Sequence, residues 1–182
     1  MTQQIIITTI LLFLFISCES RKTKEKTKHP DWVTLTLPNG WQLQTPKNFK
    51  DTTVQGIDSD PGYIYSKSDS IVLQFDSGVE LLPKDDCDFS KQVDEAKKDI
   101  ISGFYKDFYK VPTLHKAYID TIDNKVATFV LPIQTGKGTV GISISDCKSG
   151  HWLGIRGQNL NGKREKLVLD ILNTLELKNN EP

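Results

Sequence analysis

Residues 117–158 read AYIDTIDNKVATFVLPIQTGKGTVGISISDCKSGHWLGIRGQ, and the rest of the domain can be read outward from them. Apolar and polar residues alternate along this stretch in short runs, as in β-strands that bury one face. Turn-forming residues interrupt the runs at Asp123-Asn124, at Gly136-Lys-Gly138 and at Ser149-Gly150. The stretch therefore predicts an antiparallel meander whose strands span about 117–122, 125–133, 139–146 and 152–158.

A helix is expected on each side of this meander. Before it, Ser90 is a suitable N-cap for a helix that must end before Pro112. The apolar stripe of this helix consists of Val93, Ala96, Ile100, Phe104 and Phe108. After the meander, a helix is predicted from about Gly162 to Leu177. Its inward-facing residues are expected to be Leu167, Ile171, Leu172 and Leu175.

The N-terminal half of the domain contributes further strands. Residues 32–37 and 41–45 alternate with period two, and Asn39-Gly40 between them is a strong hairpin signal. Residues 46–62 are rich in Pro, Asp, Thr and Gly, which predicts an irregular loop. Two more strands are expected at residues 63–66 and 70–76.

The order of these elements predicts the α+β class: an antiparallel β-sheet meander with two main helices packed on it. Trp41-Gln-Leu-Gln-Thr-Pro-Lys-Asn-Phe49, the meander and the last helix look like the Mog1/PsbP-like α-β-α sandwich. Residues 56–59, together with residues 73–78, are similar to uncharacterised lipoproteins of Gram-negative bacteria. Families of that fold serve as binding and assembly factors, so the resemblance implies binding without catalysis.

The first residues of the chain predict export and lipid anchoring. Residues 5–16 form an uncharged apolar run, which fits a signal-peptide core and is too short to span a membrane. The run leads to Ser17-Cys18, which resembles a bacterial lipobox, where the cysteine is acylated, as with palmitate. Phe15 departs from the lipobox pattern, and residues 1–4 lack Lys and Arg. An ordinary cleavable signal peptide, a buried strand and an uncleaved anchor are the alternatives.

The chain is therefore divided into a signal peptide (1–17), a charged tether (18–30) and a single α+β domain (31–182). Basic residues outnumber acidic ones in the tether, which leaves the domain mildly acidic because the whole chain has zero net charge. A domain without a positively charged surface does not bind a polyanion, so nucleic acid is not expected as a partner. The predicted location is the periplasmic or cell-surface side of a bacterial membrane.

Cys87 and Cys147 remain once Cys18 carries lipid. In an oxidising periplasm such a pair forms a disulfide, and the alternative is two buried free thiols. A bond across this separation would stabilise the fold by up to about 4 kcal/mol in the chain-entropy model.

No motif in the sequence identifies a reaction. Gly136-Lys-Gly-Thr-Val-Gly141 matches G-x-G-x-x-G, but the strands on both sides predict a turn and not a dinucleotide site. His29, His115 and His151 are far apart and none pairs with Cys or Glu at metal-ligand spacing. We therefore expect neither a metal nor a cofactor.

The last strand of the meander suggests a binding face. Leu153 and Ile155 share one side of it, whereas Trp152 and Arg156 share the other. Trp and Arg are enriched at binding hot spots, and small residues of the preceding strand are expected beside them. The alternative is that a helix covers this face and Trp152 belongs to the core.

These patterns predict a non-catalytic binding or assembly module of the cell envelope, held to the membrane through a lipid and recognising a protein partner. An envelope hydrolase of unrecognised type and a purely structural envelope component are the alternatives.

Overall fold

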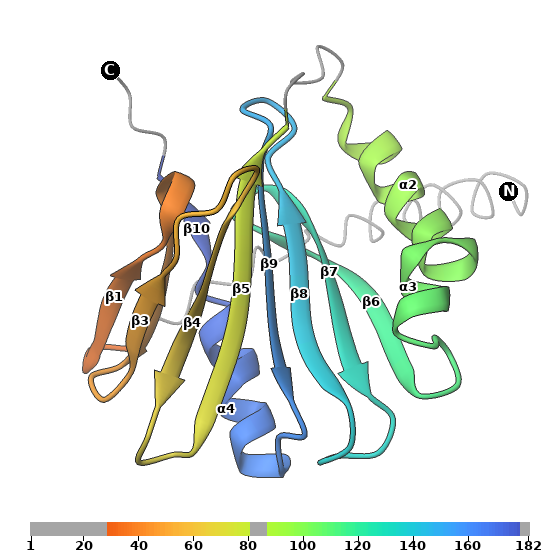
Figure 1. The fold of residues 1–182 in the computed structure, drawn as a ribbon. Coiled ribbons are helices and arrows are strands. Elements are labelled where there is room, and N and C mark those ends of the chain that lie inside the picture. Colours follow the sequence, from red (N-terminus) through yellow and green to blue (C-terminus); the bar gives the residue numbers. More distant parts are fainter. Residues whose placement is uncertain (1–28, 81–86, 179–182) are drawn as a thin grey trace, which may run out of the picture.

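The chain folds around two β-sheets in a computed structural model that describes residues 29–80 and 87–178 (Figure 1). In chain order the elements are β1 (Trp32–Thr36), η1 (Pro38–Gly40), β2 (Trp41–Pro46), β3 (Lys50–Thr53), β4 (Asp60–Ser66), β5 (Ile71–Val79), α2 (Phe89–Ser102), α3 (Phe104–Phe108), β6 (His115–Ile122), β7 (Lys125–Pro132), β8 (Thr139–Ser145), β9 (His151–Gln158), α4 (Gly162–Leu172) and β10 (Glu176–Leu177). The predicted signal peptide, Cys18 and most of the tether lie outside the described residues. Within the described part of the chain, no helix is long and apolar enough to cross a membrane.

The large sheet has the strand order β3-β4-β5-β9-β8-β7-β6, and a small sheet has the order β1-β2-β10. Strand β9 pairs antiparallel with β5 on one side and with β8 on the other. The last long strand of the chain therefore joins the N-terminal strands to the meander. Helices packed on antiparallel sheets confirm the predicted α+β class.

The hairpin predicted around Asn39-Gly40 is present. Strands β1 and β2 pair antiparallel, with Thr36 opposite Gln42 next to the turn. Asn39 and Gly40 have φ angles of 58° and 80°, a left-handed conformation that Asn and Gly adopt more readily than other residues. Strand β10 then pairs with β2, so this hairpin belongs to a sheet of its own.

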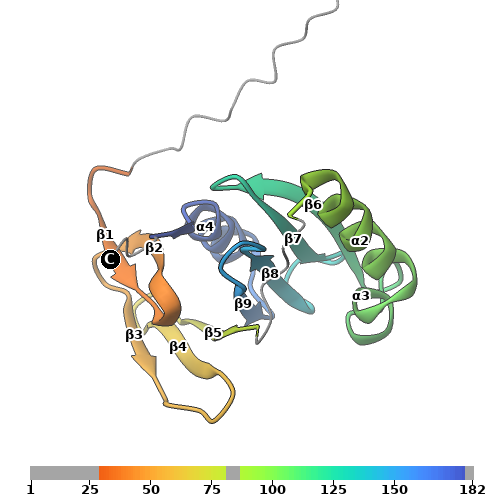
Figure 2. The same ribbon diagram turned by 90° about the horizontal axis from the view of Figure 1, so that it is seen from above.

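One face of the large sheet is the core face, and α4 covers it (Figure 2). Ile155 of β9 is 2% exposed on this side, and Trp41 of the small sheet is fully buried. Helix α4 itself buries Val168, Ile171 and Leu172. Because each large apolar side chain contributes about 1.5–3 kcal/mol when buried, this face carries most of the stability.

The opposite face of the large sheet is covered only in part. Helices α2 and α3 lie on that side, with α2 against β6 and β7, whereas β4, β5 and β9 extend beyond them (Figure 2). None of the 14 residues of α2 is buried. In α3 only Tyr105 is buried. One face of the sheet is therefore packed, and the other is partly open.

The helix expected from Ser90 toward Pro112 is in fact two helices. Gly103 separates α2 from α3 because its backbone is not helical (φ −114°, ψ −147°). The N-cap is Asp88, whose carboxylate accepts hydrogen bonds from the N–H groups of Ser90 and Lys91. Ser90, predicted as the cap, is therefore the second residue of the helix.

Other boundaries also differ from the sequence-based expectation, and strands β4, β5 and β6 are each two or three residues longer than expected at one end. Part of the predicted loop 46–62 is strand β3, whose polar sequence is that of an edge strand. Helix α4 ends earlier than expected, at Leu172. The hydroxyl of Thr174 donates to the carbonyl of Ile171 (2.6 Å), and the chain continues as β10.

Candidate functional site

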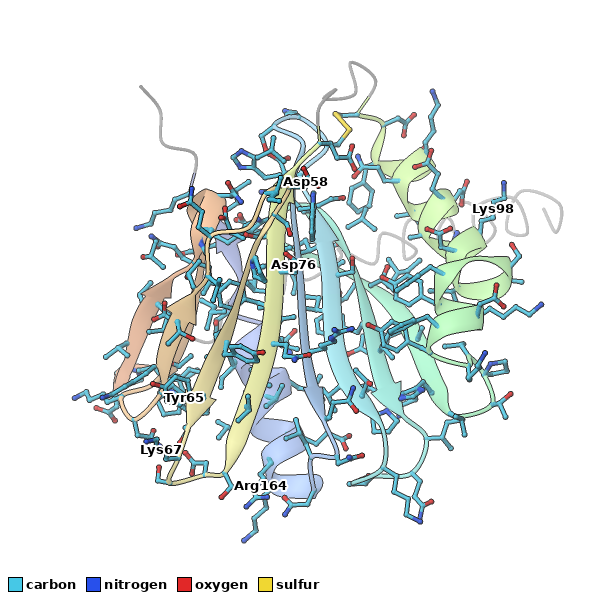
Figure 3. The ribbon with its side chains drawn as sticks, in the orientation of Figure 1. Asp58, Tyr65, Lys67, Asp76, Lys98 and Arg164 are labelled. Carbon is cyan, nitrogen blue, oxygen red and sulfur yellow. A yellow bond between two sulfur atoms is a disulfide. The ribbon has the colours of Figure 1, made fainter. Side chains whose placement is uncertain are left out.

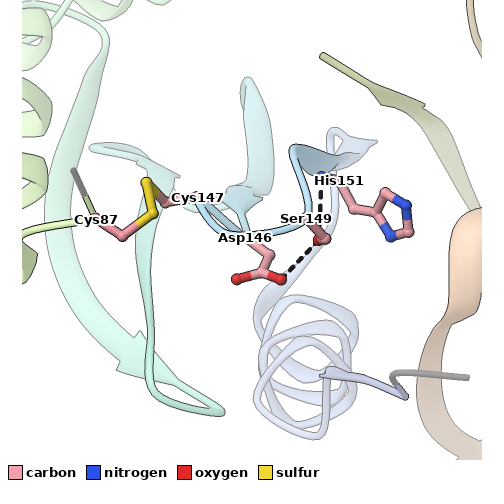
Figure 4. The surroundings of a disulfide bond; sticks show 5 residues. All are labelled: Cys87, Asp146, Cys147, Ser149 and His151. Atoms are coloured by element: carbon pink, nitrogen blue, oxygen red, sulfur yellow. Dashed lines mark hydrogen bonds between the residues drawn. A yellow bond between two sulfur atoms is a disulfide. The ribbon is translucent and has the colours of Figure 1, made fainter. Parts of the chain in front are cut away.

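Cys87 and Cys147 form a disulfide, which was one of the two states expected for them (Figure 4). Their Cα atoms lie 5.6 Å apart. The bond ties the start of α2 to the turn between β8 and β9. In that turn, the hydroxyl of Ser149 donates to the carboxylate of Asp146 (2.6 Å) and accepts the N–H of His151 (3.3 Å). A braced turn therefore holds one end of α2.

The glycine-rich segment is a turn between β7 and β8, as predicted. A Cβ on Gly138 (φ 116°) would lie 2.6 Å from Nε2 of His115. The same Nε2 accepts the N–H of Thr139 (2.9 Å), and Nδ1 of His115 contacts the carbonyl of Tyr109. His115 is thus a buried side chain with both ring nitrogens engaged. Across the described residues, no group of three or more His, Cys, Asp and Glu could hold a metal ion.

Trp152 and Arg156 lie on the face of β9 that points away from α4. Strands β8 and β9 pair as expected, so that Gly141 lies opposite Arg156 and Ser143 opposite Gly154. The residues predicted as a binding face therefore share one surface with the small residues of β8. Helix α3 covers the part of this surface near β7, and the part over β5 and β9 is left open.

Trp152 is packed against β5 without being fully buried. Gly78 lies opposite it, and a Cβ on Gly78 would come within 2.8 Å of the indole ring. The indole therefore takes the space that a side chain at position 78 would need. This contact packs the indole against the backbone of β5, on the face of the sheet that points away from α4.

A groove of about 480 Å³ lies on this face between β4 and α3. We call it the open-face groove. Its floor is formed by β5, β9 and β8, and Asp76 lies on β5 in the middle of the face (Figure 3). Aromatic side chains form its walls: Tyr63 on β4, Phe104 on α3 and Tyr109 just after α3. The groove thus combines an aromatic lining with a few polar groups on its floor.

Arg156 is exposed in the groove and is held by two neighbours. Its Nε donates to Oε1 of Gln74 (3.2 Å), and its guanidinium donates to the hydroxyl of Tyr109. Burial raises the pKa of Tyr109, whereas the charge and hydrogen bond of Arg156 act in the opposite direction. These contacts hold the guanidinium in one orientation.

Tyr105 fixes α3 on the sheet. Its hydroxyl hydrogen-bonds with Ser143 and Thr128, on β8 and β7. Burial raises the pKa of Tyr105, and these two hydrogen bonds act against that increase. The side chain therefore holds the wall of the groove at a set distance from the floor.

The most open part of the floor is at Gly154. A Cβ built there would meet only the carbonyl oxygen of Asp76, at 4.0 Å. A Cβ on Gly141 would lie 2.7 Å from the carbonyl oxygen of Ile155. Beside the open space, Oδ1 of Asp76 is buried and has no hydrogen-bond partner among the described residues. The floor thus combines an open position at Gly154 with a carboxylate on the neighbouring strand.

A second hollow of about 670 Å³, which we call the α2 cavity, lies between α2 and strands β7 and β8. Tyr105 and Ser143 line both it and the open-face groove, so the two hollows meet at this pair. Acidic side chains gather around the α2 cavity: Glu80, Asp88, Glu95, Asp99 and Asp146. Its presence explains why α2 buries none of its own residues.

Sequence reasoning missed Gln74, Asp76 and Tyr109. A signal for the first two existed, since the alternation that buries Ile71 and Phe75 leaves Gln74 and Asp76 on the other face. No comparable signal existed for Tyr109, because it reaches the groove only through the break between α2 and α3.

Known proteins resemble this chain in structure and not in sequence. No protein-family model matches the sequence, and a comparison with curated proteins finds no match either. The chain is similar to the solution structure of cyanobacterial PsbP (CyanoP) from Synechocystis sp. PCC 6803, with a TM-score of 0.48 and 10% identity over 84% of this chain and 95% of that one. It is also similar to a crystal structure from Bacteroides thetaiotaomicron VPI-5482, with a TM-score of 0.47 and 9% identity over 84% of this chain. This chain spans half the length of that second protein.

Proposed function

We propose that the chain is an exported lipoprotein whose domain is a non-catalytic binding module, with the open-face groove as its binding site. The observation that carries the proposal is the groove itself, whose volume of about 480 Å³ falls in the range typical of ligand sites. Ligand sites of this kind are mostly apolar and aromatic, with a few polar groups that fix orientation. The open-face groove has this composition.

The polar groups in the groove support binding more than catalysis. Arg156 is hydrogen-bonded to Gln74 and Tyr109, and the hydroxyl of Tyr105 to Ser143. Groups fixed in this way present a constant surface to a ligand. A protein partner was expected from the sequence, and the dimensions of the groove favour a small ligand or a short peptide segment.

Anchoring through Cys18 completes the proposal. It is supported by the apolar run at residues 5–16, by the Ser17-Cys18 pair and by the charged residues that follow. Labelling of cells with an alkyne fatty acid should tag the wild-type chain and leave Cys18→Ser untagged. Equal labelling of the two chains would contradict lipidation at this cysteine.

The groove is tested by photo-crosslinking in intact cells. Tyr63 is replaced by the photoreactive analogue benzoylphenylalanine, a change that keeps an aromatic ring in the wall of the groove. Irradiation followed by intact-mass measurement should give an adduct of defined mass. The matched control is the same replacement at Tyr65, on the same face of β4 but outside the groove. An adduct at both positions, or at neither, would contradict the proposal.

A further inference from the structure

We infer that the open-face groove binds a small zwitterion with an apolar side chain, a free α-amino acid or a dipeptide, whose carboxylate meets Arg156 and whose ammonium group meets Asp76. This inference rests on the proposed function, because it assumes that the groove is the binding site. It adds the chemical class of the ligand.

Two opposite charges on the floor carry the inference. Asp76 lies opposite Gly154, and Gln74 lies opposite Arg156, so Asp76 and Arg156 are diagonal neighbours on adjacent strands. Diagonal neighbours in an antiparallel pair lie about 7–8 Å apart, with their Cβ atoms somewhat closer. Within the described part of the chain the two side chains form no ion pair with each other. A ligand that bears both charges can lie between them.

Each of the two charged groups has capacity left for a ligand. Arg156 has five N–H donors, of which Nε is used by Gln74 and another serves the hydroxyl of Tyr109. The remaining donors match a carboxylate, which guanidinium groups bind through paired hydrogen bonds. Asp76 keeps an acceptor, Oδ1, without a partner among the described residues. A buried carboxylate oxygen without a donor is unfavourable, and a turn of the Asp76 side chain toward an ammonium group in the groove would relieve it.

The space around the charges fits a small ligand. Gly154 and Gln74 are the other two residues of this group of four, and the open floor at Gly154 leaves room for a ligand backbone to lie across β9. Tyr63 and Phe104 on the two walls offer aromatic surface to an apolar side chain. A groove of about 480 Å³ accommodates an amino acid or a dipeptide and is too small for a folded domain.

Charge balance predicts how the groove discriminates between related compounds. A zwitterion satisfies both Asp76 and Arg156, whereas a ligand with one charge leaves one of them desolvated and unpaired. Sites built around polar groups reject analogues that lack the matching group. We therefore expect each singly charged analogue to bind roughly tenfold or more weakly than the zwitterion.

The experiment titrates the full chain, purified in detergent micelles, by calorimetry. The probes are L-phenylalanine and glycyl-L-phenylalanine, with 3-phenylpropanoate and 2-phenylethylamine as analogues that lack the ammonium and the carboxylate group. We expect saturable 1:1 binding of at least one zwitterion and roughly tenfold or weaker binding of both analogues. Equal affinity for a zwitterion and either analogue would overturn the inference.

Two variants test whether Asp76 binds the ammonium group of the ligand and whether Arg156 binds its carboxylate. Asp76→Asn should weaken binding of the zwitterion and strengthen binding of 3-phenylpropanoate, because that anion no longer leaves an unpaired carboxylate beside it. Arg156→Gln should weaken binding of the zwitterion and strengthen binding of 2-phenylethylamine, because that cation no longer lies beside an unpaired guanidinium. Asp170→Asn and Arg164→Gln make the same chemical changes on α4, on the other side of the sheet, and should change nothing (Figure 3).

Failure of the inference can be distinguished from failure of the proposed function. If neither zwitterion binds while the photoreactive analogue at Tyr63 still gives an adduct in cells, the groove is a binding site and the ligand class is wrong. If neither zwitterion binds and no adduct forms, both proposals fall.

Discussion

On one side of β9, Leu153 and Ile155 are 0% and 2% exposed beneath α4, whereas on the other side Arg156 is exposed and Gly154 borders an open groove. The same strand therefore contributes to two very different surfaces. The helices on the two faces differ in the same way. Helix α4 buries three aliphatic side chains, whereas α2 buries none. Helix α2 is instead tied down at its start by the disulfide, and α3 by Tyr105.

This difference separates the part of the sheet that stabilises the fold from the part that we propose binds a ligand. Close packing on the α4 side leaves little room for change, because core positions respond to the loss of a single methylene. On the groove side, few side chains are buried, and substitutions should affect ligand binding more than unfolding.

The largest effect is expected from a comparison of two tryptophans. Trp41→Ala removes a fully buried indole from the core side, and we expect it to lower the free energy of unfolding by about 3–5 kcal/mol. Trp152→Ala removes a partly exposed indole and should cost about 1–2 kcal/mol. Urea denaturation measures both. Equal losses would show that Trp152 is a core residue and that the two faces are packed alike.

The next effect concerns the attachment of α2. Joint replacement of Cys87 and Cys147 by Ala should lower the free energy of unfolding by as much as about 4 kcal/mol. Because α2 buries no residue of its own, its amides should also exchange hydrogen faster, while those of α4 stay protected. Exchange that rises equally in both helices would contradict the proposed role of the bond as a local tie.

A smaller effect is expected from Tyr105→Phe, which removes the hydrogen bonds to Ser143 and Thr128 and should cost about 0.5–1.5 kcal/mol. Because burial raises the pKa of Tyr105, the folded state favours the neutral phenol. This contribution is complete below the unfolded pKa and is lost as the pH rises through the folded pKa. Denaturation near pH 8 and about pH 11 should show a steeper loss for the wild type than for Tyr105→Phe. A variant with the same loss would assign the pH dependence to other groups.

The smallest effect is expected at Arg156. Arg156→Gln removes an exposed guanidinium bonded to Gln74, and the free energy of unfolding should change by about 0.5 kcal/mol or less. A thermal melt beside Arg164→Gln on α4 provides the matched comparison. A much larger loss at Arg156 would mean that this side chain supports the fold, and its effect on binding would then need a different explanation.

The alternation along the strands was enough to predict the meander, the hairpin at Asn39-Gly40 and the core side of β9. It also placed Trp152 and Arg156 on one face. It did not predict β3 or β10, because an edge strand of polar residues and a strand of two residues carry little hydrophobic pattern.

The open-face groove could not be predicted from local sequence patterns, for a different reason. Its floor depends on β5 lying beside β9, a pairing between segments about 80 residues apart. Its wall depends on the helix break at Gly103, which the apolar stripe through Phe104 concealed because the stripe continues across the break. The spacing of apolar residues along the sequence predicts neither the pairing of β5 with β9 nor the helix break.

Two glycines of β9 test the difference between the faces most directly. Gly154→Leu and Gly157→Leu place the same side chain on opposite sides of one strand. A Cβ on Gly157 would lie 2.7 Å from Cδ2 of Leu73, whereas a Cβ on Gly154 would meet only the carbonyl oxygen of Asp76, at 4.0 Å. In urea denaturation, we expect Gly154→Leu to unfold near the wild-type midpoint and Gly157→Leu to lose about 1–3 kcal/mol or more. A loss for Gly154→Leu as large as that for Gly157→Leu would contradict an open binding face on this side of the sheet.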